Sequence, residues 1–445
     1  MMITVLLLLS IFLIVVFTTR FNLHPFLALI MAALFFGICS RMPLREIVSS
    51  IEQGFGGTIG RIGIVIVAGA IIGAFLDKSG GALALAERIL RIIGPRNVTP
   101  AMALIGYIVA IPVFADSGFV ILTPLNKTLT KRAGLSLATT AIALALGLMV
   151  AHTLVPPTPG PIAAAGILGA DLGWVLLLGI PVGIPTLLFC WFWAVKVAGR
   201  VRIDPNPQLT EEEFTVLQKS APSAFHALLP ILIPIVLIVL KSIADYPTHP
   251  LGQNGFSQGI SFIGTPLIAL LIGIGIALTL PKPFHRSMLS PSGWLGEAVQ
   301  AAAMIILITG AGGAFGMVLQ NSGIANTIGK SISSMPIGLW LPFTAAAAIR
   351  AAQGSSTVAI IMTASILAPM LASMGLDSPL GRALSVLAIG AGSMVASHVN
   401  DSFFWVVTQM SGMDVKTGYK LMTTGTICMG ILACTIIWII GLIVL

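Results

Sequence analysis

The fold is indicated most directly by the stretch Thr344-Ala-Ala-Ala-Ala-Ile-Arg350-Ala-Ala-Gln353-Gly354-Ser355-Ser356-Thr357, where an arginine and a Gly-Ser-Ser-Thr turn interrupt an apolar run. An ionisable side chain at membrane depth costs at least about 2.5 to 3.5 kcal/mol on insertion scales, so it needs a partner or a wet cavity. The guanidinium of Arg350 stays charged and fits a carboxylate with two hydrogen bonds. The turn offers backbone N–H groups and the hydroxyls of Ser355, Ser356 and Thr357 to an anion. We therefore expect an anion site here, or an Arg350 that pairs with an internal carboxylate such as Asp401; both can hold in different conformational states.

The composition indicates that this stretch belongs to a membrane protein. Of the 445 residues 57% are hydrophobic and only 9% are charged, whereas a soluble chain carries about a quarter charged residues. The net charge of +8 is expected on cytoplasmic loops and anionic lipid headgroups, and it does not imply nucleic acid. The four cysteines lie in apolar runs without metal-ligand or disulfide spacing. No phosphate loop, HExxH helix or nucleophile elbow is present, so we expect neither an enzyme, a cofactor, a metal nor ATP-driven transport.

Apolar windows that can enter a bilayer recur along nearly the whole chain, which predicts a multi-pass protein of a bacterial inner membrane. Several windows are too short or too rich in glycine and proline to cross simply, and these are the candidates for functional segments. The windows lie near 2–19, 22–40, 57–76, 99–114, 136–155, 174–195, 226–244, 259–280, 299–319, 336–349, 356–375, 383–397 and 421–445.

One long polar stretch divides the chain into two membrane halves. Residues 196–225 form this stretch and are predicted to be a cytoplasmic linker, because Lys and Arg concentrate in loops on that side. The halves are then 1–195 and 226–445. By the same rule the loop at 281–297 is cytoplasmic and the loop at 245–259 faces the opposite side.

The two halves resemble each other in sequence, which predicts an internal duplication with repeats at about 57–195 and 299–445. Gly69 to Gly80 aligns without gaps on Gly312 to Gly323, an offset of 322 − 79 = 243, and two further matches follow in the same order. Chance similarity of Gly/Ala-rich segments is the alternative. Charge places the copies in opposite directions, as in secondary transporters whose interrupted helices form a binding site near the midplane.

Asp116 stands in a second interrupted segment, between Ile111-Pro-Val-Phe114 and Ser117-Gly118. Proline and glycine favour a break whose freed amides can face a ligand. Asp116 is a candidate proton carrier or hydroxyl acceptor, and the alternative is that it caps the second half of the helix.

His398, Asn400 and Asp401 follow the small-residue run that begins at Gly390. A histidine titrates near neutral pH and a carboxylate exchanges protons when its solvation changes, so the pair suits coupling to a proton gradient. The two residues alone would be too few ligands for a metal.

His152 precedes the sequence Val155-Pro-Pro-Thr158-Pro-Gly-Pro161, which forbids a continuous helix. The exposed carbonyls could line a path or coordinate a cation. His152 is a candidate for proton coupling or a structural hydrogen-bonder, and Thr158 offers a hydroxyl to substrate.

These segments resemble the gluconate permease family (GntP) of the wider ion transporter superfamily. The resemblance rests on His24 to Leu29, Ile111 to Leu122, Val155 to Pro161, Arg350 to Ala359 and Ser397 to Trp405. It implies uptake of gluconate and related acids, or of D-serine in one branch, by proton symport. It also implies a homodimer with paired re-entrant hairpins and elevator-like motion. The family usually has histidine where Thr158 stands and an aliphatic residue where Ser117 stands, so the substrate is open.

The sequence hypothesis is a permease that takes up a small sugar acid with protons. Other hydroxy or amino acids and Na⁺ coupling stay open, and a membrane metal enzyme or a channel is less well supported. Proton coupling is assigned to Asp116, His152, His398 and Asp401. Substrate binding is assigned to Asp116, Ser117, Thr158, Arg350, Ser355, Ser356, Thr357 and Asn400.

Overall fold

The regular elements of the computed structural model are all helical within the residues that it describes, 2–94, 97–205, 221–245, 250–252, 254–323 and 338–445. The expected all-α fold is confirmed for these ranges. The main helices are α1 (Met2–Thr19), α2 (Pro25–Cys39), α3 (Leu44–Lys78), α4 (Gly81–Ile93), α5 (Val98–Val109), α6 (Ala115–Arg132), α7 (Leu137–Leu154), α8 (Pro159–Leu168), α9 (Leu172–Lys196), α11 (Ala224–Ala244), α12 (Gly255–Ile263), α13 (Pro266–Ala277), α14 (Trp294–Asn321), α16 (Trp340–Gln353), α17 (Ser356–Leu367), α18 (Pro379–Ser393), α19 (Ser402–Met410), α20 (Val415–Gly418) and α21 (Thr424–Val444).

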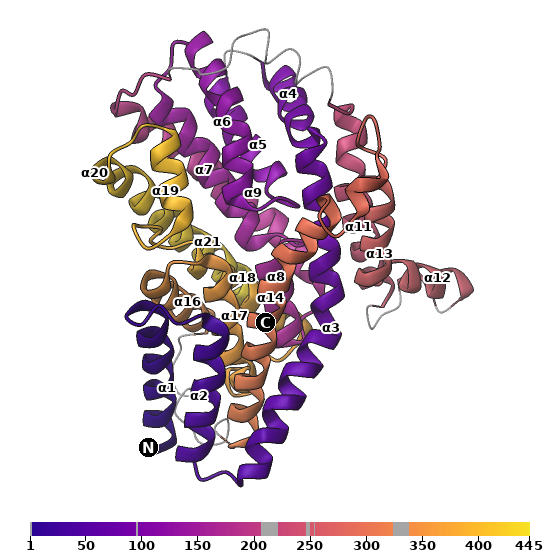
Figure 1. Ribbon diagram of the computed structural model, residues 1–445, viewed down its shortest axis with the longest axis vertical. Coiled ribbons are helices and arrows are strands. Elements are labelled where there is room, and N and C mark those ends of the chain that lie inside the picture. Colours follow the sequence, from indigo (N-terminus) through magenta and orange to yellow (C-terminus); the bar gives the residue numbers. More distant parts are fainter. Residues whose placement is uncertain (1, 95–96, 206–220, 246–249, 253, 324–337) are drawn as a thin grey trace.

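Helices α3 and α14 pack against each other along much of the molecule (Figure 1). Their backbones approach closely because glycines face each other: a Cβ on Gly54 would meet the carbonyl of Gly313, and one on Gly313 would meet Thr58. Small residues allow such close helix pairs in membranes, where packing replaces the hydrophobic effect. The pair forms a long wall, with α1 and α2 at one end and α4 to α6 at the other (Figure 1).

Helix α7 is enclosed by other parts of the chain, and all of its 18 residues are buried. It packs against α5, α6 and α9. A Cβ on Gly147 of α7 would meet the carbonyl of Ala103 of α5, so this contact also depends on a glycine. A helix that is apolar all round is expected to be enclosed by protein in this way.

Four breaks separate consecutive helices where the sequence predicts interruptions. Residues 110–114 with Pro112 separate α5 from α6, and residues 155–158 with two prolines separate α7 from α8. Gly354, with φ of +90°, and Ser355 separate α16 from α17. Residues 394–401 separate α18 from α19. Proline removes a helix donor and glycine adopts the left-handed conformation, so both favour these breaks.

The membrane-length helical stretches are fewer than the predicted windows, and the helices are uneven in length. Six helical stretches in the described residues are long and apolar enough to span a membrane, or seven if α12 and α13, bent by 64°, count as one. The windows at 99–114 and 356–375 correspond to α5 and α17, which have 12 residues each. They fall short of the roughly 20 residues that a span needs because each ends or begins at a break.

The predicted linker at 196–225 lies between α9 and α11. Residues 206–220, including the acidic run Glu211 to Glu213, are outside the described residues. The predicted loop at 245–259 is described only in part, and it contains the start of α12.

Candidate functional site

A cavity of about 250 Å³ lies where the helix breaks converge. One wall is apolar and comes from α14 through Ala301, Met304, Ile305 and Ile308. The other wall contains the polar groups of three breaks and of α7, namely Asp116, His152, Ser355, Ser356, Thr357, Asp401 and Ser402. Pockets for drug-sized ligands measure about 300 to 1,000 Å³, so this cavity suits a small organic molecule.

Three helices begin at this cavity, and their first residues line it. Ala115 opens α6, Ser356 opens α17 and Ser402 opens α19. Each helix N-terminus carries about half a positive charge and unsatisfied N–H groups. Three such ends around one cavity make it favourable for an anion, as expected from the Gly-Ser-Ser-Thr turn.

The three helices differ in whether a capping side chain accepts a hydrogen bond from the first backbone N–H groups. The Ser355 side chain accepts a hydrogen bond from the Val358 amide at 3.3 Å, and the Asp401 Oδ1 atom accepts one from the Phe403 amide at 3.0 Å. Within the described residues, helix α6 has no side-chain cap hydrogen bond. Its first turn therefore offers backbone N–H groups that no cap satisfies.

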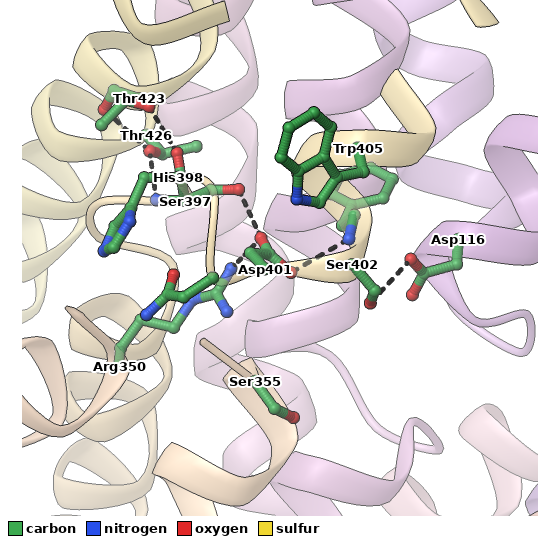
Figure 2. Close-up of polar contacts among 12 residues, drawn as sticks. Asp116, Arg350, Ser355, Ser397, His398, Asp401, Ser402, Trp405, Thr423 and Thr426 are labelled. Atoms are coloured by element: carbon green, nitrogen blue, oxygen red, sulfur yellow. Dashed lines mark hydrogen bonds and ion pairs between the residues drawn. The ribbon is translucent and has the colours of Figure 1, made fainter. Parts of the chain in front are cut away.

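Arg350 forms a buried ion pair with Asp401, which also accepts a hydrogen bond from the Ser397 hydroxyl (Figure 2). The guanidinium is 1% exposed, and its Nε and Nη1 atoms have no hydrogen-bond partner in the described part of the chain. Asp401 lines the cavity, whereas Arg350 does not. The positive charge of Arg350 therefore influences the cavity through its ion pair with Asp401. The N–H groups on Nε and Nη1 remain able to donate to a second acceptor.

Asp116 and Ser402 connect the first break to the last. The Ser402 hydroxyl donates to Asp116 Oδ1 at 3.3 Å. Figure 2 shows Arg350, Asp401, Ser402 and Asp116 following one another across the site. With both carboxylates ionised and Arg350 charged, this row has one net negative charge, so an anion could enter more easily after a proton does.

His398 and Asn400 lie behind the cavity and hold the end of α16. His398 Nε2 is 3.0 Å from the Ala351 carbonyl, and Asn400 Nδ2 donates to the same carbonyl at 2.9 Å and to that of Ala352 at 3.3 Å. These carbonyls have no partner within α16, because the helix ends at Gly354. Neither His398 nor Asn400 is among the residues that line the cavity.

The other predicted site residues lie in different surroundings. His152 lines the cavity, is buried and has an Nδ1 atom without a partner in the described residues. Thr158 is buried and donates its hydroxyl to the Val155 carbonyl at 2.7 Å, outside the cavity lining. Ser117 lines a second cavity of about 180 Å³.

Sequence reasoning missed the apolar wall of α14 and the contact of Ser397 with Asp401. The spacing Ser397 to Asp401 was a usable signal for the second. No three His, Cys, Asp or Glu side chains of the described residues come together as metal ligands.

A cavity ringed by helix starts, inside a bundle with several membrane-length helices, defines a membrane transporter. Residues 1–443 match the family described as GntP family permease, and the chain belongs to that family. The expected resemblance is thereby confirmed, and the chain is a multi-pass permease of the bacterial inner membrane, not an enzyme.

Named relatives span nearly the whole chain. It is 36% identical to "Gluconate permease" of Pseudomonas aeruginosa, with 96% of this chain and 95% of that protein covered. It is 35% identical to "D-serine transporter DsdX" of Escherichia coli K12, with 96% and 95% covered. The solved structure of the YdaH transporter of Alcanivorax borkumensis matches with a TM-score of 0.64, 16% identity and coverage of 90% of this chain and 89% of that one. That likeness shows a shared fold.

Proposed function

We propose that this permease takes up a small sugar acid such as gluconate by proton symport. The observation that carries the proposal is the convergence of three helix N-termini on a cavity that also holds Asp116 and Asp401. The helix ends favour the substrate carboxylate, and the two acidic side chains give the proton a place to bind.

The substrate carboxylate is placed against the start of α17, with Ser355, Ser356 and Thr357 as its closest contacts. All three line the cavity. Arg350 supports the same end through Asp401, and it can exchange Asp401 for the substrate because two of its nitrogen atoms, Nε and Nη1, have no partner among the described residues. Asn400 and Thr158 serve substrate binding indirectly here, since their hydrogen bonds fix the backbone of the breaks.

Proton coupling follows from the charge of the row of acidic groups. A sugar acid brings a second negative charge to a site that already has one, and the low dielectric of the membrane interior makes that pair costly. A proton on Asp116 removes one charge and turns the side chain into a donor for a substrate hydroxyl. His152 lines the cavity, and its Nδ1 atom has no hydrogen-bond partner among the described residues, so it is the second candidate carrier. His398 is kept as a third, although it contacts Ala351.

Transport by two inverted repeats and an elevator-like motion completes the proposal. The helix bounds support the duplication: α3 ends at Lys78 and α14 at Asn321, and 321 − 78 = 243. Helices α9 and α20 begin at Leu172 and Val415, and 415 − 172 = 243. The breaks between α5 and α6 and between α16 and α17 correspond at similar offsets: α5 ends at Val109 and α16 at Gln353, and 353 − 109 = 244, whereas α6 begins at Ala115 and α17 at Ser356, and 356 − 115 = 241. A homodimer is part of the proposal.

The test is uptake of labelled gluconate into proteoliposomes with an imposed inward proton gradient. Arg350→Ala and Asp401→Asn are compared with the wild type, and detergent gel filtration checks that each variant is folded. Gradient-driven uptake that both changes abolish supports the proposal. Uptake by wild type that follows Na⁺ at fixed pH instead of the proton gradient would overturn proton coupling.

A second candidate substrate is D-serine, which the name of one relative states for that protein. The hydroxyls of Ser117 and Thr158 stand where the resemblance leads us to expect other residues, so the panel includes D-serine and other hydroxy acids. If D-serine is taken up much faster than gluconate, the proposed substrate becomes the amino acid. The proposed binding residues stay the same.

A further inference from the structure

The second cavity lies directly beside the first. It has a volume of about 180 Å³, and Phe114 and Ala301 line both cavities. Asp116 faces the first cavity and its neighbour Ser117 faces the second, so the first turn of α6 separates the two. A proton that leaves Asp116 can therefore enter the second cavity, because the adjacent residue Ser117 already lines that cavity.

The charged lining of the second cavity favours a cation over an anionic substrate. Asp77, Lys78 and Glu297 line it, and they carry one net negative charge when all are ionised. Lys78 and Glu297 form an ion pair whose side chains are 30% and 56% exposed. Such an exposed pair contributes only about 0 to 1 kcal/mol and can open. Asp77 is less exposed than Lys78, and among the described residues it forms no ion pair.

The volume is sufficient for a wet path. A cavity needs about 10 to 15 Å³ of water-accessible space to hold one water molecule, so 180 Å³ has room for several. The carboxylates, the ammonium group and the Ser117 hydroxyl supply the polar partners that ordered water needs. The exposed ends of Lys78 and Glu297 mark the side of this cavity nearest to solvent. The arginines of α4, Arg88 and Arg91, are exposed close by in the sequence and indicate the cytoplasm.

We propose that this second cavity is a proton exit route, separate from the substrate cavity, with Asp77 as its carrier. The inference rests on the proposed proton symport. The Asp116 carboxyl group gives its O–H proton to a water molecule and becomes a carboxylate. Water carries the proton past Ser117 to an Asp77 oxygen, and Asp77 releases it to water beside Lys78 and Glu297. Substrate leaves from the first cavity by another path.

Two assays on the same proteoliposomes separate proton movement from substrate movement. Gradient-driven uptake requires the proton to be released, whereas exchange of internal unlabelled for external labelled gluconate does not. Asp77→Asn is expected to lower gradient-driven uptake about 100-fold, the lower end of what a positioned proton carrier contributes. Exchange should keep the wild-type rate. Asp77→Glu should restore part of the uptake.

The matched control is Glu52→Gln, an exposed carboxylate of the same helix that lines neither cavity. It should leave both assays unchanged. Asp77→Asn protein that loses exchange and uptake together, or that keeps both, overturns the proton route. Gluconate transport by the wild-type protein without any proton dependence would instead contradict proton symport itself. This outcome is measured on the wild type alone, so it is distinguishable from failure of the Asp77 route.

Discussion

The Ser402 hydroxyl donates to the Asp116 carboxylate at 3.3 Å and so joins the first turns of two helices that are 286 residues apart in sequence. Helix α6 belongs to the first half of the chain and α19 to the second. Asp116, Ser402 and Asp401 all line the substrate cavity. A proton or substrate that changes the charge of Asp116 therefore acts on both halves at once.

Ser402→Ala is expected to slow gradient-driven uptake by about 3-fold to 10-fold, since a hydrogen bond as long as 3.3 Å is expected to contribute no more than an ordinary one, about 0.5 to 1.5 kcal/mol. Thermal stability should change little, because Ser402 is exposed to the cavity and its loss leaves no buried group unpaired. The measurement is initial uptake rate against substrate concentration. Ser292→Ala, on a loop outside the cavity, is the control. An unchanged rate in Ser402→Ala would show that the two halves communicate elsewhere.

Arg350→Met should destabilise the protein strongly. The change leaves Asp401 buried with no cation, and breaking a buried pair in this way costs about 3 to 5 kcal/mol. Asp401→Asn in the same chain should recover part of the loss. The measurement is the midpoint of thermal unfolding in detergent.

Lys241→Met provides the comparison for Arg350→Met. Lys241 pairs with Asp245 at 2.6 Å, but its side chain is 23% exposed and that of Asp245 is 44% exposed. Pairs of this kind contribute about 0 to 1 kcal/mol. Equal effects of the two substitutions would mean that the Arg350 pair is not buried as described.

Gly354→Ala should abolish transport and lower stability. Gly354 has φ of +90°, and a Cβ there would meet the carbonyl of Asn400. Gly375 is the matched control, since it has φ of +68° and no atom within 4 Å of an added Cβ. Gly375→Ala carries only the backbone strain of about 1 to 2 kcal/mol. Uptake and the unfolding midpoint are measured for both variants. A larger loss in Gly354→Ala than in Gly375→Ala would show that contact with residues 394–401 positions the turn, and equal losses would show that backbone strain alone explains the effect.

The sequence predicted the interruptions well because proline, glycine and charge inside apolar runs have direct backbone consequences. Arg350 and Asp401 were both singled out, but sequence left open whether they bind each other or a ligand. Their pairing depends on how α16 packs against the break before α19. Asn400 is predicted to bind substrate, and in the structure its amide donates hydrogen bonds to the Ala351 and Ala352 carbonyls. That role exists only because α16 ends where residues 394–401 pass.

The apolar wall was not predictable in the same way. Met304 and Ile305 belong to an ordinary hydrophobic helix, and nothing in their local sequence distinguishes a cavity wall from a lipid-facing surface. Only the long-range pairing of α14 with α3 and α17 gives them their position. Sequence patterns indicate local backbone preference. Apolar residues whose role depends on contacts with residues distant in sequence have no distinguishing local pattern.

Thr357→Asp should raise stability and reduce transport. Opposite effects of one substitution would distinguish a role of this position in anion binding from a role in folding. Thr357 is in the first turn of α17 and lines the cavity. A carboxylate in a first turn stabilises the helix by about 0.3 to 1 kcal/mol through the helix dipole. The same charge repels a substrate carboxylate that binds there, so the KM for gluconate should rise at least about tenfold. Thr357→Asn has nearly the same shape without the charge, and its KM should stay close to that of the wild type. If Asp and Asn raise KM equally, shape and not charge governs this position, and the start of α17 is not where the carboxylate binds.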